Sequence, residues 1–470
     1  MTVENVVPGK RLTVRQALQA AFVGSEFDFT HIPISRAVLL LAIPMVLEMA
    51  MESLFGLVDI LFVARLGATA VAIVGLTENL LAVVFSVGTG LAMAATALVA
   101  RRVGEKDPEG ASRAAFQVLV LGFGAALMLA VAGVVLAPQL LRALGAGPEV
   151  LARGTLYTRV MLGSQVSILL LFVFNGIFRG AGDAAMSMRS LWLANLVNLA
   201  LDPCLIFGLG FFPKLGVLGA AVATTTGRTV GVLYQVASVL KGSRRIALAR
   251  RHLRIEAGLL WTALKTASGA TGQFLVTTVS WAVVIRVVAR FGSEAIAGYT
   301  IAIRIIIVAI LPAWGMANAA STLVGQNLGA KKPERAEQAV WRVGFYNLLF
   351  LGSVAVLFIA FAEPILGVFT RDPSVLRSGV SCLRYVASGY GLYAYGMVMM
   401  QAFYGAGDSR TPLLVSLLCY WVVQIPCAIL LARTAMGERG VYLALPIGES
   451  LNAVLAVVMF RRGRWKTVRL

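Results

Sequence analysis

The chain has 470 residues, of which 59% are hydrophobic and only 13% are charged. Soluble domains carry roughly a quarter charged residues, so this composition excludes a soluble globular protein and predicts an all-α protein that crosses a membrane many times. The formal net charge of +19 could suggest a nucleic-acid partner, but the distribution of the basic residues argues against one.

Apolar stretches that reach or approach the roughly 20 residues needed to cross a bilayer recur along the whole chain. Pro44 lies in the first of them and Pro426 in the eleventh, where a missing backbone donor can bend a helix. We predict twelve transmembrane helices, at residues 34–62, 69–99, 114–136, 155–178, 187–210, 215–239, 258–289, 295–324, 340–362, 378–403, 411–432 and 439–460.

Short phrases occur twice in the chain at one constant spacing. The offset is 225 positions in each case (292 − 67, 329 − 104 and 408 − 183), without an insertion. Such a repeat predicts two pseudo-symmetric lobes of six helices each, with a site between them, as in many transporters. The repeated phrases are Leu66-Gly67 with Phe291-Gly292, Val103-Gly104 with Leu328-Gly329, and Gly180-Ala-Gly-Asp183 with Gly405-Ala-Gly-Asp408.

Most of the 41 Lys and Arg residues fall in the N-terminal arm, the even-numbered loops and the C-terminal tail. Basic loops stay on the cytoplasmic side, so both termini are predicted to be cytoplasmic, with contacts to membrane lipid and none to nucleic acid. No removable signal peptide is expected. The predicted divisions are an arm (1–33), an N-lobe (34–240), a basic linker (241–257), a C-lobe (258–460) and a basic tail (461–470).

The residues do not form the constellations that hydrolases or metalloenzymes need. The four cysteines are isolated in apolar segments, and neither HExxH nor GxSxG occurs. The two Gly-Ala-Gly-Asp phrases lack the strand and the Gly-Lys-Ser/Thr ending of a phosphate loop, so they are predicted to be turns between helices. We therefore predict no catalytic residues, no enzyme activity, no cofactor and no obligate protein partner.

The first span contains three acids on one face. Glu48, Glu52 and Asp59 fall within about 40° of each other at roughly 100° per residue. Because an ionised side chain inside a membrane costs a few kcal/mol, this face is expected to line a cavity or to meet polar helices. Interfacial solvation is the alternative for Glu48, and a structural hydrogen bond is the alternative for Asp59. Glu78 adds a further acid in the second span.

The fifth span brings an amide and a carboxylate to one face. Asn198 and Asp202 are four residues apart, and Pro203 loosens the backbone beside them. With Asp59 they form an oxygen-rich set that could bind Na⁺, while two close carboxylates could equally carry a proton. The sequence leaves the choice between the two ions open.

The second half lacks these acids. Arg286, Arg304 and Glu449 are its charged residues in or near the spans, so ion chemistry is expected mainly in the first half. Shifted by 225 positions, Glu48 corresponds to Gln273, Glu52 to Thr277, Asp59 to Val284 and Asp202 to Cys427. Aromatic and sulfur side chains could form an adaptable wall for flat cations, or could simply be core residues: Phe55, Phe85, Trp281, Trp314, Met316 and Tyr395.

In these phrases the chain resembles the multidrug and toxic compound extrusion (MATE) family, from about residue 34 to 460. The resemblance rests on Val58-Asp59 before Leu66-Gly67, Arg179-Gly-Ala-Gly-Asp183, Asn198 with Leu201-Asp-Pro203, Gly219 to Thr224, and Gly325-Gln-Asn-Leu-Gly-Ala330. It implies a multi-pass plasma (inner) membrane antiporter that alternates between inward-open and outward-open states and exports organic cations in exchange for H⁺ or Na⁺.

The resemblance to the DinF-like and archaeal members also implies an ion-coupling group. It would consist of Asp59, Asn198 and Asp202, joined by Asn175 and Thr224, with possible Na⁺ at the first three. Glu48, Glu52, Glu78 and Gln273 would belong to the substrate cavity, where Gln273 replaces the glutamate of another branch. Binding of the ion would neutralise the cluster, let the first helix bend near Pro44 and release the cation. A flippase for lipid-linked saccharides is the alternative within the same superfamily.

Overall fold

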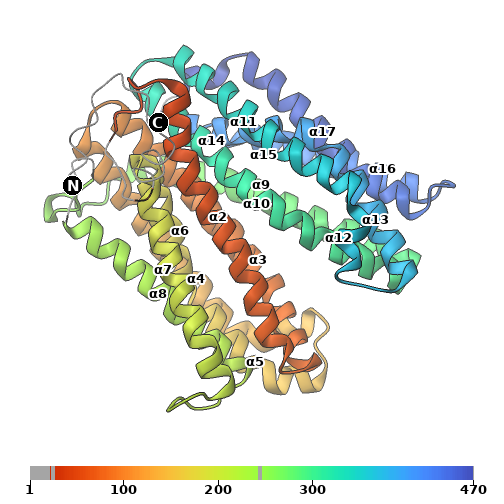
Figure 1. The fold of residues 1–470 in the computed structure, drawn as a ribbon. Coiled ribbons are helices and arrows are strands. Elements are labelled where there is room, and N and C mark those ends of the chain that lie inside the picture. The colour runs from red at the N-terminus through yellow and green to blue at the C-terminus, as the bar shows by residue number, and fades with distance from the viewer. Residues whose placement is uncertain (1–21, 23–26, 242–245, 469) are drawn as a thin grey trace.

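The computed structural model describes residues 22, 27–241, 246–468 and 470, and these fold into helices joined by short turns. Figure 1 shows two bundles that meet near the C-terminus and diverge away from it, in the outline of a V. The first bundle, the N-lobe, contains α2 (Ile34–Ala64), α3 (Ala68–Gly104), α4 (Pro108–Ala143), α5 (Pro148–Gly163), α6 (Gln165–Ala181), α7 (Ala184–Phe207) and α8 (Val217–Lys241).

The second bundle, the C-lobe, repeats the order of long helices with more interruptions. Its tenth predicted span divides into α13 and α14 at Gly389, and its eleventh contains a π-helical segment, η4. The elements are α9 (Ala257–Val288), α10 (Ser293–Gly329), α11 (Pro333–Ala360), α12 (Ala362–Gly367), α13 (Pro373–Ser388), α14 (Tyr390–Ala406), α15 (Arg410–Ser416), η4 (Leu417–Gln424), α16 (Ile425–Ala432) and α17 (Glu438–Arg461).

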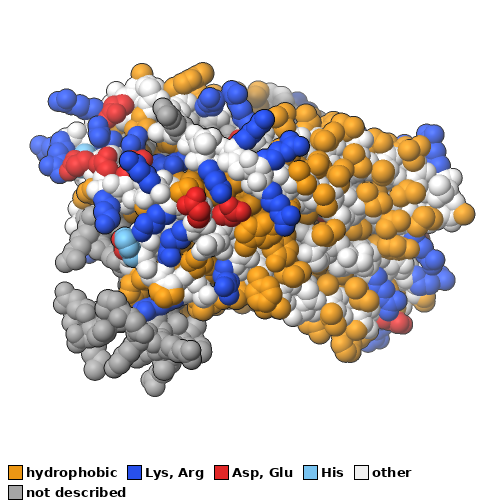
Figure 2. Space-filling view, turned by 90° about the horizontal axis from the view of Figure 1, so that it is seen from above, with side chains coloured by type: hydrophobic (Ala, Val, Ile, Leu, Met, Phe, Trp, Pro, Cys, Tyr) orange, Lys and Arg blue, Asp and Glu red, His pale blue; other side chains and the backbone are white. Residues whose placement is uncertain are grey.

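The predicted spans agree with these helices. In the described part of the chain, ten helices, some of them interrupted, are long and apolar enough to cross a membrane. The two remaining predicted spans, 215–239 and 378–403, correspond to α8 and to α13 with α14, which pack in the same bundles. Figure 2 shows a broad hydrophobic surface with basic side chains on both sides of it, as expected for a protein embedded in lipid.

The repeat is visible in the backbone as well as in the sequence. Gly182 ends α6 with a φ of 86°, and Gly407 ends α14 with a φ of 87°. The aspartate that follows each glycine accepts from an amide in the first turn of the next helix: Asp183 from Met186 at 3.0 Å, and Asp408 from Thr411 at 3.1 Å. The prediction that these phrases are helix–turn–helix junctions is therefore confirmed.

The lobes touch closely at one end of the V, which we call the closed end. A Cβ atom on Gly104 of α3 would lie 2.0 Å from the carbonyl oxygen of Gln326 on α10. The Gln326 amide donates to the carbonyl of Gly180 at 2.9 Å, and the Thr322 hydroxyl donates to the carbonyl of Arg179 at 3.0 Å. Small residues let helix backbones approach in this way where lipid gives no hydrophobic driving force. The opposite end, where the lobes diverge in Figure 1, is the open end.

Candidate functional site

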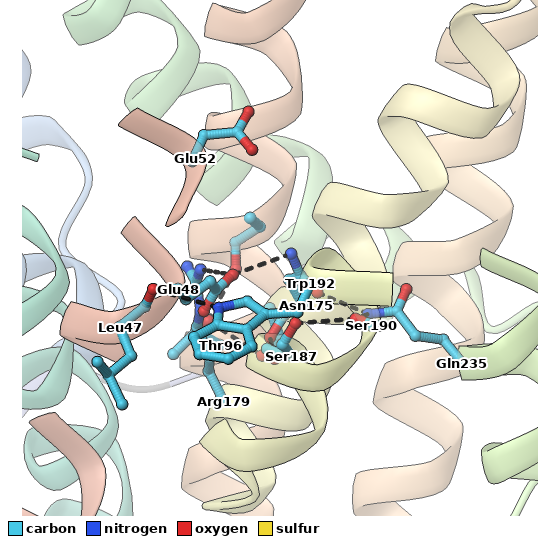
Figure 3. A network of polar contacts seen from close by, with 12 residues as sticks. Leu47, Glu48, Glu52, Thr96, Asn175, Arg179, Ser187, Ser190, Trp192 and Gln235 are labelled. Carbon is cyan, nitrogen blue, oxygen red and sulfur yellow. Dashed lines mark hydrogen bonds and ion pairs between the residues drawn. The ribbon is translucent and has the colours of Figure 1, made fainter. Parts of the chain in front are cut away.

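The acids of α2 face α6, α7 and α8 as three levels of polar contacts along the N-lobe. The first level, nearest the closed end, surrounds Glu48, which is fully buried. Its Oε1 accepts from the Arg179 guanidinium at 2.5 Å and from the Asn175 amide at 3.2 Å. Figure 3 shows these side chains pointing toward one another. Glu48 is therefore enclosed by these partners and meets neither interfacial water nor an open cavity in this structure.

Asn175 belongs to the same level as Glu48. Its Oδ1 accepts from the Gln235 amide at 2.6 Å, and Gln235 also donates to the Ser190 hydroxyl at 2.7 Å (Figure 3). Ser190 and Asp202 are twelve residues apart on α7, which is about 18 Å along the helix. The structure thus places Asn175 in the Glu48 network, well away from the group around Asp202 that it was expected to join.

The second level surrounds Glu52, one turn farther along α2. Glu52 accepts from the Asn195 amide at 3.2 Å and forms an ion pair with Arg228 of α8 at 3.6 Å. The Arg228 guanidinium also lies over the Phe85 ring, 5.8 Å from its centroid. The Glu52 side chain is one-third exposed, so this carboxylate, unlike that of Glu48, is not enclosed by the lobe.

The third level brings together four of the residues expected to couple ions. The carboxyl groups of Asp59 and Asp202 lie close enough to interact directly, and two neighbouring buried carboxyl groups cannot both keep a full negative charge at low cost. With its amide nitrogen turned toward Asp202, Asn198 donates to both carboxylate oxygens at 2.7 and 3.1 Å. In this orientation of the amide, the Asn198 oxygen accepts from the Thr224 hydroxyl at 3.1 Å. Both the nitrogen and the oxygen of the amide then have a hydrogen-bond partner.

The third level also has a free acceptor. The Asp59 Oδ1 atom is buried without a hydrogen-bond partner among the described residues. A buried carboxylate oxygen is stable only when a cation, a proton or a donor satisfies it. The oxygens of Asp59, Asp202, Asn198 and Thr224 therefore fit a proton or a hard monovalent cation, and nothing in their chemistry distinguishes the two.

Two further groups act on this level. Tyr157 of α5 is buried and interacts electrostatically with Asp59, Asp202 and Glu78. Tyr157 was not among the residues predicted from the sequence, although a tyrosine inside a predicted span is itself a signal, because its hydroxyl needs a partner there. Glu78 of α3 interacts with Asp59 and with Arg304 of the C-lobe, so it lies between the third level and the opposite lobe.

The C-lobe contains a separate cavity of about 250 Å³. Gln273, Trp281 and Trp314, three of the residues predicted to line a substrate cavity, line this one, and so does Glu449 of α17. Phe55 and Met316 are half-buried and lie outside this cavity. Tyr395, a further candidate for the wall, instead packs on Trp341 with ring centroids 5.8 Å apart, inside the C-lobe.

Comparison with known proteins gives consistent relationships over the whole chain. The MatE family model matches twice, at residues 44–204 and 270–430, an offset of 226 positions (270 − 44) that agrees with the internal repeat. A relative from Pseudomonas aeruginosa named probable multidrug resistance protein NorM is 30% identical over 93% of this chain and 90% of its own length. A relative from Shewanella oneidensis named FAD transporter is 26% identical over 92% and 95%.

Solved structures share the two-lobe architecture. One described as the outward-facing conformation of a multidrug resistance MATE family transporter of the MOP superfamily superposes with a TM-score of 0.87. The two chains are 26% identical, and the match covers 98% of this chain and all of the other.

Proposed function

The chain belongs to the MatE family, and on that premise we propose that it is a secondary active antiporter that exports organic cations in exchange for H⁺ or Na⁺. The observation that carries the proposal is the third level of the N-lobe, where the carboxyl groups of Asp59 and Asp202 lie together beside Asn198 and Thr224. We further propose that it is a multi-pass protein of the plasma membrane. Both termini would be cytoplasmic, because loops rich in Lys and Arg are retained on the cytoplasmic side of a membrane.

Ion and cargo would compete for negative charge in the N-lobe. When H⁺ or Na⁺ binds at Asp59 and Asp202, the third level loses charge and holds an organic cation less tightly. A ligand shifts a conformational equilibrium only by its different affinities for the two states, so the ion must bind differently when the open end closes. Pro44 lies within α2, where a bend would move Glu48, Glu52 and Asp59 together relative to the first turns of the helix.

The assignment of the coupling group follows the DinF-like and archaeal branch. Asp59, Asn198, Asp202 and Thr224 occupy the positions of that pattern and contact one another, whereas Asn175 belongs to the Glu48 network. Gln273, which stands where another branch has a glutamate, supports coupling through the N-lobe. No cofactor is needed for this transport, because the ion gradient supplies the free energy that moves the cargo uphill.

Cationic cargo suits the site better than the anionic headgroup of a lipid-linked saccharide. The basic residues of the first two levels, Arg179 and Arg228, are paired with Glu48 and Glu52. A relative named for FAD transport indicates that cargo varies within the family, so the charge of the cavity, and not the family alone, supports organic cations here.

The test is ion-driven transport in reconstituted vesicles. An imposed pH or Na⁺ gradient should drive uphill movement of a fluorescent organic cation, and the gradient that works identifies the coupling ion. Asp59→Asn and Asp202→Asn keep the size and hydrogen bonding of the side chain but remove its ionisation, so both variants should fall to the rate of protein-free vesicles. The matched control Glu363→Gln, an exposed residue of α12, should transport normally. Wild-type rates in both aspartate variants would refute the coupling group.

A further inference from the structure

The C-lobe cavity contains an acid whose surroundings differ from those of every N-lobe acid described above. Glu449 is the one charged side chain among the described residues that line the 250 Å³ cavity, and it also lines a smaller cavity of about 40 Å³ beside it. Its polar partner is the Tyr420 hydroxyl, which donates to Oε2 at 3.0 Å. Glu48 and Glu52, by contrast, each have an arginine in an ion pair. The Glu449 carboxylate therefore lacks a built-in counter-charge within the described chain.

The walls of the cavity are aromatic. Phe274 packs on Trp314 with centroids 5.4 Å apart and on Tyr404 with centroids 6.5 Å apart, so three rings form a continuous surface. Trp281 and Tyr393 line both cavities together with Glu449. Aromatic faces attract cations and repel anions, and they offer no ligands to a bare Na⁺ ion.

A second polar atom remains available to a ligand. Gln401 lines the cavity and is only 2% exposed, and its Oε1 has no hydrogen-bond partner among the described residues. An amide oxygen buried in this way is costly unless something satisfies it. A ligand carrying an N–H or a polarised C–H group next to a positive nitrogen would do so.

The backbone that presents Tyr420 is unusual. Tyr420 lies in η4, an eight-residue π-helical segment that ends directly before α16, whose second residue is Pro426. Proline cannot donate to the carbonyl four residues earlier, and its ring needs space there, which a widened helix provides. π-helical turns are rare and occur frequently at functional sites. Here the segment holds the tyrosine that contacts the unpaired acid.

We propose that the C-lobe cavity is a binding site for a small, flat, monovalent organic cation, with Glu449 as its counter-charge and Trp281, Trp314 and Tyr393 as its aromatic walls. The cavity is slightly below the roughly 300–1,000 Å³ of typical ligand pockets, so the cation is small. This site deepens the proposed function, on which it rests, by adding a cargo site in the lobe opposite the coupling group.

Binding to the purified protein tests the site. The probe is the fluorescent cation N-methyl-4-(4-dimethylaminostyryl)pyridinium, and its neutral parent, 4-(4-dimethylaminostyryl)pyridine at pH 9, has nearly the same shape without the charge. Glu449→Gln should weaken binding of the cation about tenfold or more and leave the neutral parent almost unaffected, because only the charge interaction is lost. Unchanged affinity for the cation, or an equal loss for both probes, would overturn the proposal.

A matched control lies on the same helix. Glu438, at the start of α17, accepts from the Ser378 hydroxyl at 3.2 Å outside the cavity, so Glu438→Gln should bind the cation as the wild type does. If Glu449→Gln does not fold, Gln273→Glu provides a second test. It adds another carboxylate to the cavity lining and should therefore tighten binding of the cation. Weaker or equal binding in that variant counts against the site.

Failure of this site and failure of the proposed function are distinguishable. If Glu449→Gln binds the cation normally while gradient-driven export in vesicles persists, the C-lobe site is refuted and the antiporter remains. If the wild type moves no cation under either gradient, the antiporter is refuted whatever Glu449 does.

Discussion

Glu48 and Arg179 form the most deeply buried ion pair of the described chain. The carboxylate is fully buried, the guanidinium side chain is 9% exposed, and each keeps one buried atom, Oε2 and Nε, without a partner. A buried pair gains little over an apolar pair of the same size, but removing one partner leaves a bare charge at a cost of about 3–5 kcal/mol. The pair therefore makes the N-lobe sensitive to changes at either position.

We expect Glu48→Gln to lower the thermal stability of the detergent-solubilised protein substantially, because Arg179 then lacks its counter-charge. The double variant Glu48→Leu with Arg179→Met should recover most of the loss, because neither charge remains. The measurement is the temperature at which half of the protein leaves the monodisperse peak in size-exclusion chromatography. A double variant as unstable as the single one would contradict this account of the pair.

At the scale of the helices, the closed end depends on glycines that allow α3 and α10 to touch. Gly104 and Gly329 are repeat equivalents (329 − 104 = 225), and a Cβ atom on Gly329 would lie 2.1 Å from the Arg101 carbonyl oxygen. Both contacts involve backbone atoms, which cannot move aside as a flexible side chain can. One glycine from each lobe therefore allows α3 and α10 to come into contact at the closed end.

Gly104→Ala should separate α3 from α10, lowering stability and slowing transport. The matched control is Gly124→Ala on α4, where a Cβ atom would meet nothing within 4 Å. There the substitution should be neutral or stabilising by up to about 1 kcal/mol, because alanine favours helix more than glycine does. Melting temperature and vesicle transport are measured for both variants. Similar results for the two would mean that the contact between α3 and α10 does not require a glycine at position 104.

At the scale of the whole molecule, the V shape and the repeat together define the motion expected of an alternating-access transporter. The lobes are joined by hydrogen bonds at the closed end and diverge at the other (Figure 1). Since the halves are related by pseudo-symmetry, equivalent positions in the two lobes should approach each other at one end as they separate at the other.

Spin labels can follow this motion at exposed repeat equivalents, in a background with the four native cysteines replaced. Ala68 and Ser293 report on the open end, and Lys106 and Lys331 on the closed end, each pair 225 positions apart (293 − 68 and 331 − 106). Changing the pH, or adding Na⁺, should shorten one distance and lengthen the other in pulsed EPR. Two distances that stay constant while the same protein transports would exclude rocking of the lobes.

The helices, their number and the two-lobe repeat could be predicted from the sequence because they depend on local properties. Spans follow from about 20 apolar residues, turns from Gly182 and Gly407, and the first-turn hydrogen bonds of the next helices from Asp183 and Asp408. The shared face of Asn198 and Asp202 is also local, since it needs only helical periodicity over one turn.

The tertiary structure alone decided which acids are paired and which are open. Glu48 and Asp59 share a face of α2, yet Glu48 meets Arg179, 131 residues away, and Asp59 meets Asp202. Asn175 donates a hydrogen bond to Glu48, and Glu449 accepts one from Tyr420 but forms no ion pair with an arginine in the described chain. Helical periodicity determines the direction of a side chain, but its partner depends on how helices from distant parts of the chain pack, and inside a membrane that packing decides whether a carboxylate is a structural ion pair or a site for a cation.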